Sequence, residues 1–287
     1  PEWVGANHPF HALQALRDRM VPQHQPAAAP SSLLRAACDA QDTDLELTAD
    51  GAILFGTARL AHLVGGSRLL SPRLALEVDE TGHAAQEVQS RLQLFITHRI
   101  ESLLGKPDEL DERLQAAGRG LVYQLRHGLG TVAARDVAAL VPTLADDERT
   151  VLQRHSIVLG KHFVYSRRAL KLPQQNTRRA LLRAHLASPQ PLPALGQSRV
   201  SYPLRGRPPK PIAQACLLLG HPVLGDLAVR VDVIERIANE LGTREIQTAD
   251  LGRVLQLFGC KRSQAVGALA ALGYRSAPKS RAKLERV

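Results

Sequence analysis

Apolar residues recur at three- and four-residue steps in many stretches of the chain, and this spacing predicts amphipathic helices. The clearest example runs from Thr81 to Leu104, and Gly105 and Pro107 follow it as stop signals. The same spacing predicts further helices over residues 8–20, 31–40, 108–117, 119–127, 132–140, 143–154, 176–187, 229–242, 248–259 and 263–272. Short connections between the central helices favour an antiparallel bundle.

Two stretches alternate with a period of two, which is typical of strands. Residues 45–56 alternate around Asp50-Gly51, a pair that favours a two-residue hairpin turn, and short extended pieces continue as far as Val78. Residues 156–171 also predict a strand or an extended piece.

These elements predict a mainly α protein with a small β module. We expect a helical bundle and a C-terminal helical module that resembles a helix-turn-helix, joined by a Pro-rich basic linker. The expected boundaries are an N-terminal helix and linker over 1–30, the small β module over 31–80, the helical bundle with a basic strand and helix over 81–187, the linker over 188–211, the C-terminal module over 212–276 and a basic tail over 277–287.

Positive charge is concentrated in one part of the chain. The whole sequence has 37 Lys and Arg against 27 Asp and Glu. The segment from Arg149 to Gly225 holds thirteen of these cations and no acid. A segment this one-sided favours a polyanion, a membrane surface or an acidic partner.

Within this segment, alternation places Lys161, Phe163, Tyr165 and Arg167 on one face of the predicted strand. Two rings between two cations form a plausible platform for stacking bases while holding phosphates. The alternative is that both rings point into the core and only the charges are exposed.

The helix after this strand is expected to carry Arg178, Arg179 and Arg183 on its outer surface. Lys261 and Arg262 lie in the turn of the helix-turn-helix-like pair, whose second helix offers few side chains that could read a base edge. The sequence predicts that nucleic acid is contacted by Lys161, Phe163, Tyr165, Arg167, Arg168, Lys171, Arg178, Arg179, Arg183, Arg205, Arg207, Lys210, Lys261 and Arg262.

The linker offers a second kind of interaction. Arg205-Gly206-Arg207-Pro208 resembles the core of an AT-hook, in which an extended Arg-Gly-Arg enters the minor groove of A·T-rich DNA. A basic linker that holds RNA or DNA backbone without sequence preference is the alternative.

Catalytic patterns are absent from the sequence. It has no GxxxxGK[ST] phosphate loop and no GxSxG, HExxH or GxGxxG pattern. The three Cys are far apart, which predicts reduced thiols and no zinc site. We therefore expect no enzyme in this chain, no metal and no cofactor. With no secretory signal and no apolar run long enough to span a bilayer, we expect a cytoplasmic protein without a membrane partner.

Several stretches together resemble the C-terminal, post-motor region of proteobacterial superfamily-two helicases related to the RNA helicase of the mitochondrial degradosome. They are ADGAILFGTARLAHLVGGSRLLSPRLAL, VQSRLQLFITHRIESLLG, AAGRGLVYQLRHGLG, LQRHSIVLGKHFVYSRRALKLP, VRVDVIERIANEL and LQLFGCKRSQAVGALAALGYR. The resemblance covers roughly Leu45 to Arg275. This sequence departs from the family at Leu54-Phe55, where a Trp is expected, and at Ala169–Pro173, where the family has Leu-Leu-Lys-Pro.

The resemblance implies an accessory region that grips single-stranded RNA or DNA beside an ATP-dependent motor. The motor lobes, with their ATP and Mg²⁺, would lie upstream, and the first residue, Pro1 rather than Met, suggests a fragment. Two alternatives stay open: a DNA-binding protein that uses the AT-hook-like linker and the final helical pair, and a protein-interaction scaffold whose basic face meets an acidic partner.

Overall fold

The computed structural model describes residues 31–77, 82–105, 110, 112–186, 195, 199–242, 245–246 and 248–276. In this described part about 53% of the structure is helix and 20% is strand, with nine α-helices and three small antiparallel sheets. The protein is therefore mixed α/β, and the prediction of a mainly α fold with one small β module is wrong. The predicted helix over 8–20 and the tail over 277–287 lie outside the described residues.

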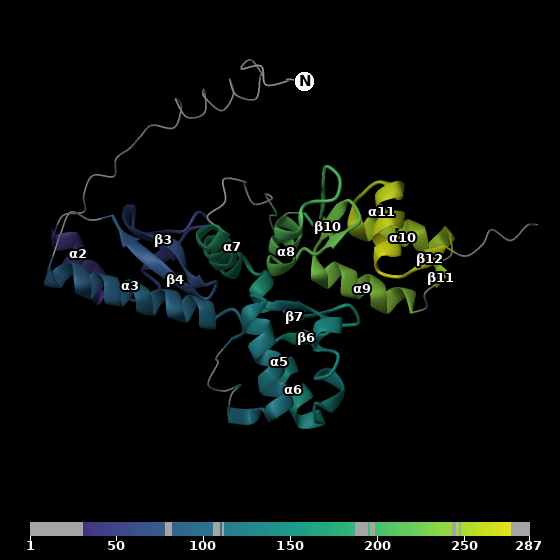
Figure 1. Cartoon of the computed structure of the whole chain (residues 1–287), viewed down its shortest axis with the longest axis horizontal. Helices are drawn as coiled ribbons and strands as arrows, with labels where there is room; N and C mark the ends of the chain where they lie inside the picture. The colour runs from purple at the N-terminus through teal and green to yellow at the C-terminus, as the bar shows by residue number, and fades with distance from the viewer. Residues whose placement is uncertain are drawn as a thin grey trace, which may run out of the picture.

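The first unit of the fold is a four-stranded antiparallel sheet with helices against it (Figure 1). Its elements are α2 (Ser31–Asp39), β1 (Leu45–Leu47), β2 (Ala52–Phe55), β3 (Ala58–Arg68), β4 (Ser71–Leu76), α3 (His83–Glu101) and α7 (Leu172–Leu186). Pairing of Leu45 with Phe55 confirms the hairpin predicted around Asp50-Gly51. Its loop has three residues, 49–51, and not two, because the Thr48 N–H donates to the Ala52 carbonyl. Apolar residues of the sheet and of α3, such as Leu60 and Phe95, share one core.

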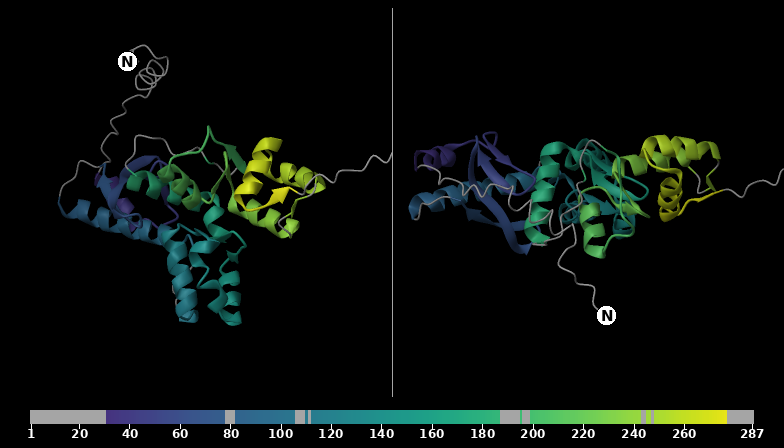
Figure 2. Two further views of the ribbon diagram at one scale, coloured as in Figure 1. Left: turned by 45° about the vertical axis from the view of Figure 1, so that its right-hand side comes forward. Right: turned by 90° about the horizontal axis from the view of Figure 1, so that it is seen from above.

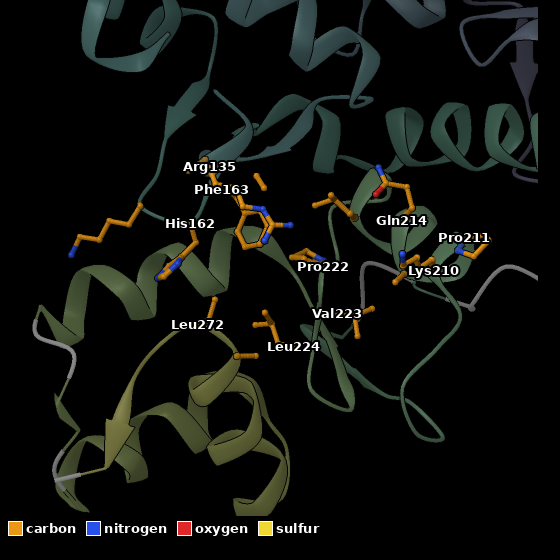
Figure 3. Close-up of a pocket in the computed structure, with 16 residues that line it drawn as sticks. Arg135, His162, Phe163, Lys210, Pro211, Gln214, Pro222, Val223, Leu224 and Leu272 are labelled. Atoms are coloured by element: carbon orange, nitrogen blue, oxygen red, sulfur yellow. The ribbon is translucent and has the colours of Figure 1, made fainter. Parts of the chain in front are cut away.

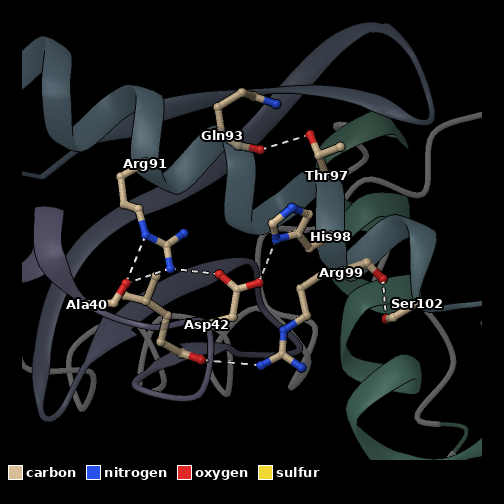
Figure 4. Close-up of polar contacts among 9 residues, drawn as sticks. Ala40, Asp42, Arg91, Gln93, Thr97, His98, Arg99 and Ser102 are labelled. Carbon is tan, nitrogen blue, oxygen red and sulfur yellow. Dashed lines mark hydrogen bonds and ion pairs between the residues drawn. The ribbon is translucent and has the colours of Figure 1, made fainter. Parts of the chain in front are cut away.

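A cluster of charged side chains connects the segment before β1 to α3 through hydrogen bonds and ion pairs (Figure 4). Arg91 donates to the Ala40 carbonyl and to Asp42 Oδ1 at 2.7 Å, and His98 Nδ1 lies 2.8 Å from Asp42 Oδ2. Burial opposes ionisation of Asp42, but the hydrogen bonds from His98 and Arg91 outweigh it, so the pKa of Asp42 is lowered. The cluster fixes the position of His98 near the end of α3.

The second unit is a small three-stranded sheet with two helices below it in Figure 1. Its elements are α5 (Ala116–His127), β5 (Thr131–Ala133), α6 (Asp146–Arg154), β6 (Ile157–Leu159), β7 (Phe163–Ser166) and the 3₁₀ turns η1 (Ala134–Val137), η2 (Val141–Thr143) and η3 (Arg168–Leu170). The helix predicted over 132–140 is wrong, because Val132 pairs with Val164 of β7, a partner that lies outside any local window.

The third unit combines a second three-stranded sheet with the C-terminal helices. Its elements are β8 (Ser201–Pro203), α8 (Lys210–Leu218), β9 (Val223–Leu224), β10 (Leu227–Val229), α9 (Val231–Leu241), β11 (Glu245–Ile246), α10 (Thr248–Phe258), α11 (Arg262–Ala271) and β12 (Arg275–Ser276). Helices α10 and α11 form the predicted pair around Gly259, which has φ of 61°. Strand β8 lies inside the predicted linker and pairs with β10, so this region contains a sheet as well as helices.

Helices α7 and α8 occupy the middle of the molecule, between the first sheet and the C-terminal helices (Figures 1 and 2). They are joined by hydrogen bonds from Arg178 of α7 to Leu218 of α8. The segments before and after the predicted linker are therefore bonded directly to each other. No helix among the described residues is long and apolar enough to cross a membrane.

Candidate nucleic-acid interface

Both predicted stacking rings are buried. Phe163 is 8% exposed and Tyr165 is 3% exposed, and both pack into the core of the C-terminal unit with residues such as Ile234. Val164, between them, packs into the core of the second unit. Because β7 is covered on both faces, the stacking platform is wrong and the alternative, rings in the core, is correct.

Arg178 is also buried, with no exposed surface, although it was predicted on the outside of its helix. Its Nε donates to the Leu218 carbonyl at 2.7 Å, its Nη1 to the Ala169 carbonyl at 3.0 Å and its Nη2 to Thr131 Oγ1 at 3.1 Å. Burial lowers the pKa of Arg178 to about 9, which leaves the guanidinium protonated at neutral pH. Arg178 therefore connects four elements and is not available to phosphate.

The turn between β6 and β7 is bonded to the buried carboxylate of Glu235 on α9. Glu235 accepts the backbone N–H groups of Lys161, His162 and Phe163 at 2.6, 2.8 and 2.7 Å. The Lys161 ammonium donates to the Ala238 carbonyl at 2.7 Å. At Gly160 an added Cβ would lie 2.3 Å from the Glu235 Cδ. Glycine at this position therefore allows the turn to pack against the Glu235 carboxylate.

The structure brings three other predicted residues, Arg167, Arg168 and Lys171, into one hollow of about 590 Å³. This hollow, which we call the basic groove, lies where the ends of α3 and β7 meet the start of α7. It is lined by His98, Glu101, Ser102, Gly105, Ser156, Arg167, Arg168, Lys171 and Gln174. Glu101 is the one carboxylate in its lining.

The cations of the basic groove are exposed, and within the described part of the chain Arg167, Arg168 and Lys171 form no ion pair. Other exposed arginines do, as when Arg236 lies 3.0 Å from a Glu240 oxygen. Three uncompensated charges in one hollow produce a positive potential that attracts an anion.

Tyr165 supports the groove from inside the protein. Burial and the nearby charge of Asp232 raise the pKa of its phenol, and a hydrogen bond with Arg167 opposes the shift. The side chain of Tyr165, which was predicted to stack on a base, is therefore buried and hydrogen-bonded to Arg167 of the groove.

A neighbouring hollow of about 340 Å³ shares Arg167 and Ser156 with the groove. It also contains Arg149, whose guanidinium donates to the Leu144 and Val141 carbonyls at 3.2 and 2.6 Å. Ser156 has φ of 64°, a left-handed conformation uncommon for serine, at the turn from α6 into β6. The two hollows extend the positive surface along the edge of β6.

The remaining predicted residues lie away from the basic groove. Arg179 is half-buried near Tyr202, and burial lowers its pKa, while Arg183 is exposed on α7. Arg205 and Arg207 flank a bend at Gly206, with φ of 79°, and not the extended chain of an AT-hook. Three more are exposed elsewhere, at the start of α8 and at the α10–α11 turn: Lys210, Lys261 and Arg262.

Sequence reasoning missed His98, Ser156 and Gln174, which line the groove. Gln174 follows Lys171 at one helical turn, so the spacing could have suggested it. His98 and Ser156 come from distant segments, and nothing local in their sequence marks them.

No group of three His, Cys, Asp or Glu side chains within the described residues is placed to hold a metal ion. Comparison with protein-family models, with curated proteins and with solved structures finds no match. The likeness to helicase C-terminal regions therefore rests on the sequence motifs alone.

Proposed function

We propose that this chain binds single-stranded nucleic acid in the basic groove, mainly through phosphate contacts. The observation that carries the proposal is the set of three exposed cations, Arg167, Arg168 and Lys171, without ion pairs among the described residues. They lie in a segment that has no Asp or Glu from Arg149 to Gly225. Phosphate groups supply the missing negative charge.

Two features favour a single strand over base readout in a duplex. The groove is lined by residues at the ends of several elements, so no single helix face forms it as a reader of the major groove would require. In the helix-turn-helix-like pair, α11 consists mainly of Ala, Val, Leu and Gly, and its exposed Val266, which is 46% exposed, cannot hydrogen-bond to a base edge. Binding is then nearly independent of sequence, because the rings of Phe163 and Tyr165 are enclosed in the core.

The resemblance to helicase C-terminal regions supports a place for this chain beside an ATP-dependent motor. In that setting the groove holds the strand while upstream lobes bind ATP and Mg²⁺, and this chain performs no chemistry itself. This proposal requires that the gene encode a phosphate loop upstream of Pro1, which its sequence would show.

The binding test is fluorescence anisotropy with labelled oligouridylate and oligothymidylate at a series of salt concentrations. Three phosphate contacts predict a log–log salt slope near −2, or roughly a fifteenfold loss of affinity between about 50 and 200 mM salt. The triple variant Arg167→Glu, Arg168→Glu, Lys171→Glu is expected to lose binding, because it reverses every uncompensated cation of the groove.

The matched control is Arg35→Glu, Arg68→Glu, Arg113→Glu. It changes the net charge by the same amount at three exposed residues that do not line the groove. Nearly full binding is expected for the control. Equal losses in both triple variants would mean that only net charge attracts the strand, and the groove would be rejected as the site.

A further inference from the structure

A separate hollow, of about 740 Å³, lies on the C-terminal side of β7, and we call it the α8–α11 cleft (Figure 3). His162 and Phe163 lie on one side of it, Lys210 and Gln214 come from α8, and Leu272 lies at the end of α11. Its volume is within the range of about 300–1,000 Å³ that is common for ligand pockets. None of the residues that line the basic groove lines this cleft.

The inner surface of the cleft is mainly aliphatic. Side chains of Leu217, Pro222, Val223 and Leu224 form much of it, and Phe163 contributes little ring surface because it is 8% exposed. Stacking platforms for nucleotide bases are built from open aromatic faces. An aliphatic surface instead favours aliphatic side chains of a peptide.

The rim of the cleft is positive. Arg135, Lys161 and Lys210 line it from three different elements, η1, the β6–β7 turn and α8, and no Asp or Glu is among its lining residues. Lys210 is the first residue of α8, so the helix dipole adds positive potential at the same point. Arg135 contacts Asp136 only across 3.5 Å, with both side chains strongly exposed, and such a pair is weak. Lys161 keeps two N–H groups after it donates to Ala238.

We propose that the α8–α11 cleft docks an acidic peptide segment that carries aliphatic side chains. The aliphatic surface buries those side chains, and the cations on three elements pair with carboxylates spaced along the peptide. The proposal does not depend on the basic groove, because the two hollows have no lining residue in common.

The test begins with selection of random displayed peptides on the wild-type protein, after removal of those that bind the variant Arg135→Glu, Lys210→Glu. Selected sequences are expected to combine Asp or Glu with Leu, Ile or Val. Isothermal titration of one synthetic selected peptide is then expected to show at least about tenfold weaker binding to the double variant than to wild type. Failure to select peptides, or selection of sequences without acids, overturns the proposal.

Three further proteins sharpen the result. The variant Gln214→Glu adds one carboxylate at an exposed cleft residue with almost no change of shape, and it is expected to weaken the peptide severalfold. The control Arg35→Glu, Arg68→Glu matches the charge change of the double variant outside the cleft and is expected to bind within about twofold of wild type. Thermal melting of each variant verifies that the fold is intact.

The third protein is the groove variant Arg167→Glu, Arg168→Glu, Lys171→Glu, which is expected to bind the peptide within about twofold of wild type. Oligonucleotide binding separates the two proposals. If Arg135→Glu, Lys210→Glu weakens oligonucleotide binding as much as the groove variant does, the cleft belongs to the nucleic-acid site and the peptide proposal fails. Loss of oligonucleotide binding only in the groove variant, with peptide binding lost only in the cleft variant, supports both.

Discussion

Three cations of one short stretch of chain have an environment opposite to that of a fourth. Arg167, Arg168 and Lys171 line an open groove without ion pairs among the described residues, whereas Arg178, two turns further along α7, is fully buried and bonded to carbonyls. The difference is caused by α8, which supplies the Leu218 carbonyl to Arg178 and does not line the groove. Charge in the sequence therefore locates a region, and the tertiary packing decides which cations remain available to a ligand.

The most direct way to break this comparison is Arg178→Met, which keeps an unbranched side chain but removes every donor. The Leu218 and Ala169 carbonyls and the Thr131 hydroxyl then lose their buried partner. Each buried acceptor left without a partner costs about 1–3 kcal/mol, so we expect a loss of about 3–5 kcal/mol in the free energy of unfolding, measured by urea titration. Arg183→Met on the exposed side of the same helix is the control, with an expected change within about 0.5 kcal/mol. A loss below about 1 kcal/mol for Arg178→Met would contradict a structural role.

The second prediction concerns His221, which is buried next to Arg178. Burial, opposed by the Leu219 carbonyl and aided by the charges of Arg178 and Arg230, lowers the pKa of His221 to about 4. In the unfolded chain His221 binds a proton near the reference pKa of 6.5, whereas in the folded protein it stays neutral down to about pH 4. The contribution of neutral His221 to the free energy of unfolding is therefore fully present above pH 6.5 and is lost as pH falls from about 6.5 through 4. Urea titrations across this range are expected to show a loss of about 3 kcal/mol.

In the variant His221→Gln this acid-induced loss of stability is expected to disappear. In Arg178→Met the pKa of folded His221 is expected to rise, because one repelling positive charge is removed, so the acid-induced loss ends at a higher pH. An unchanged pH profile in His221→Gln would assign the acid sensitivity to another group.

The third prediction tests the turn that Glu235 holds. In Glu235→Gln an amide NH₂ replaces one of the two oxygens that accept backbone N–H groups of residues 161–163, so at least one donor faces another donor. We expect a loss of about 2 kcal/mol in the free energy of unfolding. Glu240→Gln, at an exposed glutamate on the same helix that pairs with Arg236 and Arg253, should lower the free energy of unfolding far less than Glu235→Gln does, because surface ion pairs are weak. Equal effects of the two substitutions would show that the buried carboxylate has no special role.

The smallest expected effect concerns an exposed cation of the basic groove. Arg168→Ala removes one phosphate contact, so the log–log salt slope for a single strand should fall in magnitude by about 0.7 while the free energy of unfolding changes by less than about 0.5 kcal/mol. Anisotropy and urea titration on the same preparation measure both quantities. A stability loss comparable to that of Arg178→Met would show that Arg168 has a structural role like that of Arg178.

Local patterns predicted those elements whose contacts are local. The spacing of Val88, Leu92, Phe95 and Ile96 identified α3, and all four side chains are buried. The Asp50-Gly51 turn identified the first hairpin. The fold class was wrong because β5 and β8 each pair with a strand far along the chain, and their short apolar stretches fit helix or loop equally well.

The site was predicted in part for the same reason. Arg167, Arg168 and Lys171 are close in sequence, so a charge count found them together. Alternation could place Phe163 and Tyr165 on one face but could not show that α9, some seventy residues later, covers that face. A charged residue on a helix is rarely buried, and Arg178 is buried only because distant carbonyls converge on it.

The hydrogen bonds of Glu235 also constrain the order in which the protein is completed during synthesis. They join residues 72–74 positions apart, so the β6–β7 turn leaves the ribosome well before the carboxylate that accepts its N–H groups. Until α9 emerges, the face of β7 that carries Phe163 and Tyr165 lacks the α9 residues that cover it. A nascent chain that ends near residue 187 therefore lacks the apolar residues of α9 that pack on Phe163 and Tyr165, and the native core forms only after the C-terminal unit has been synthesised.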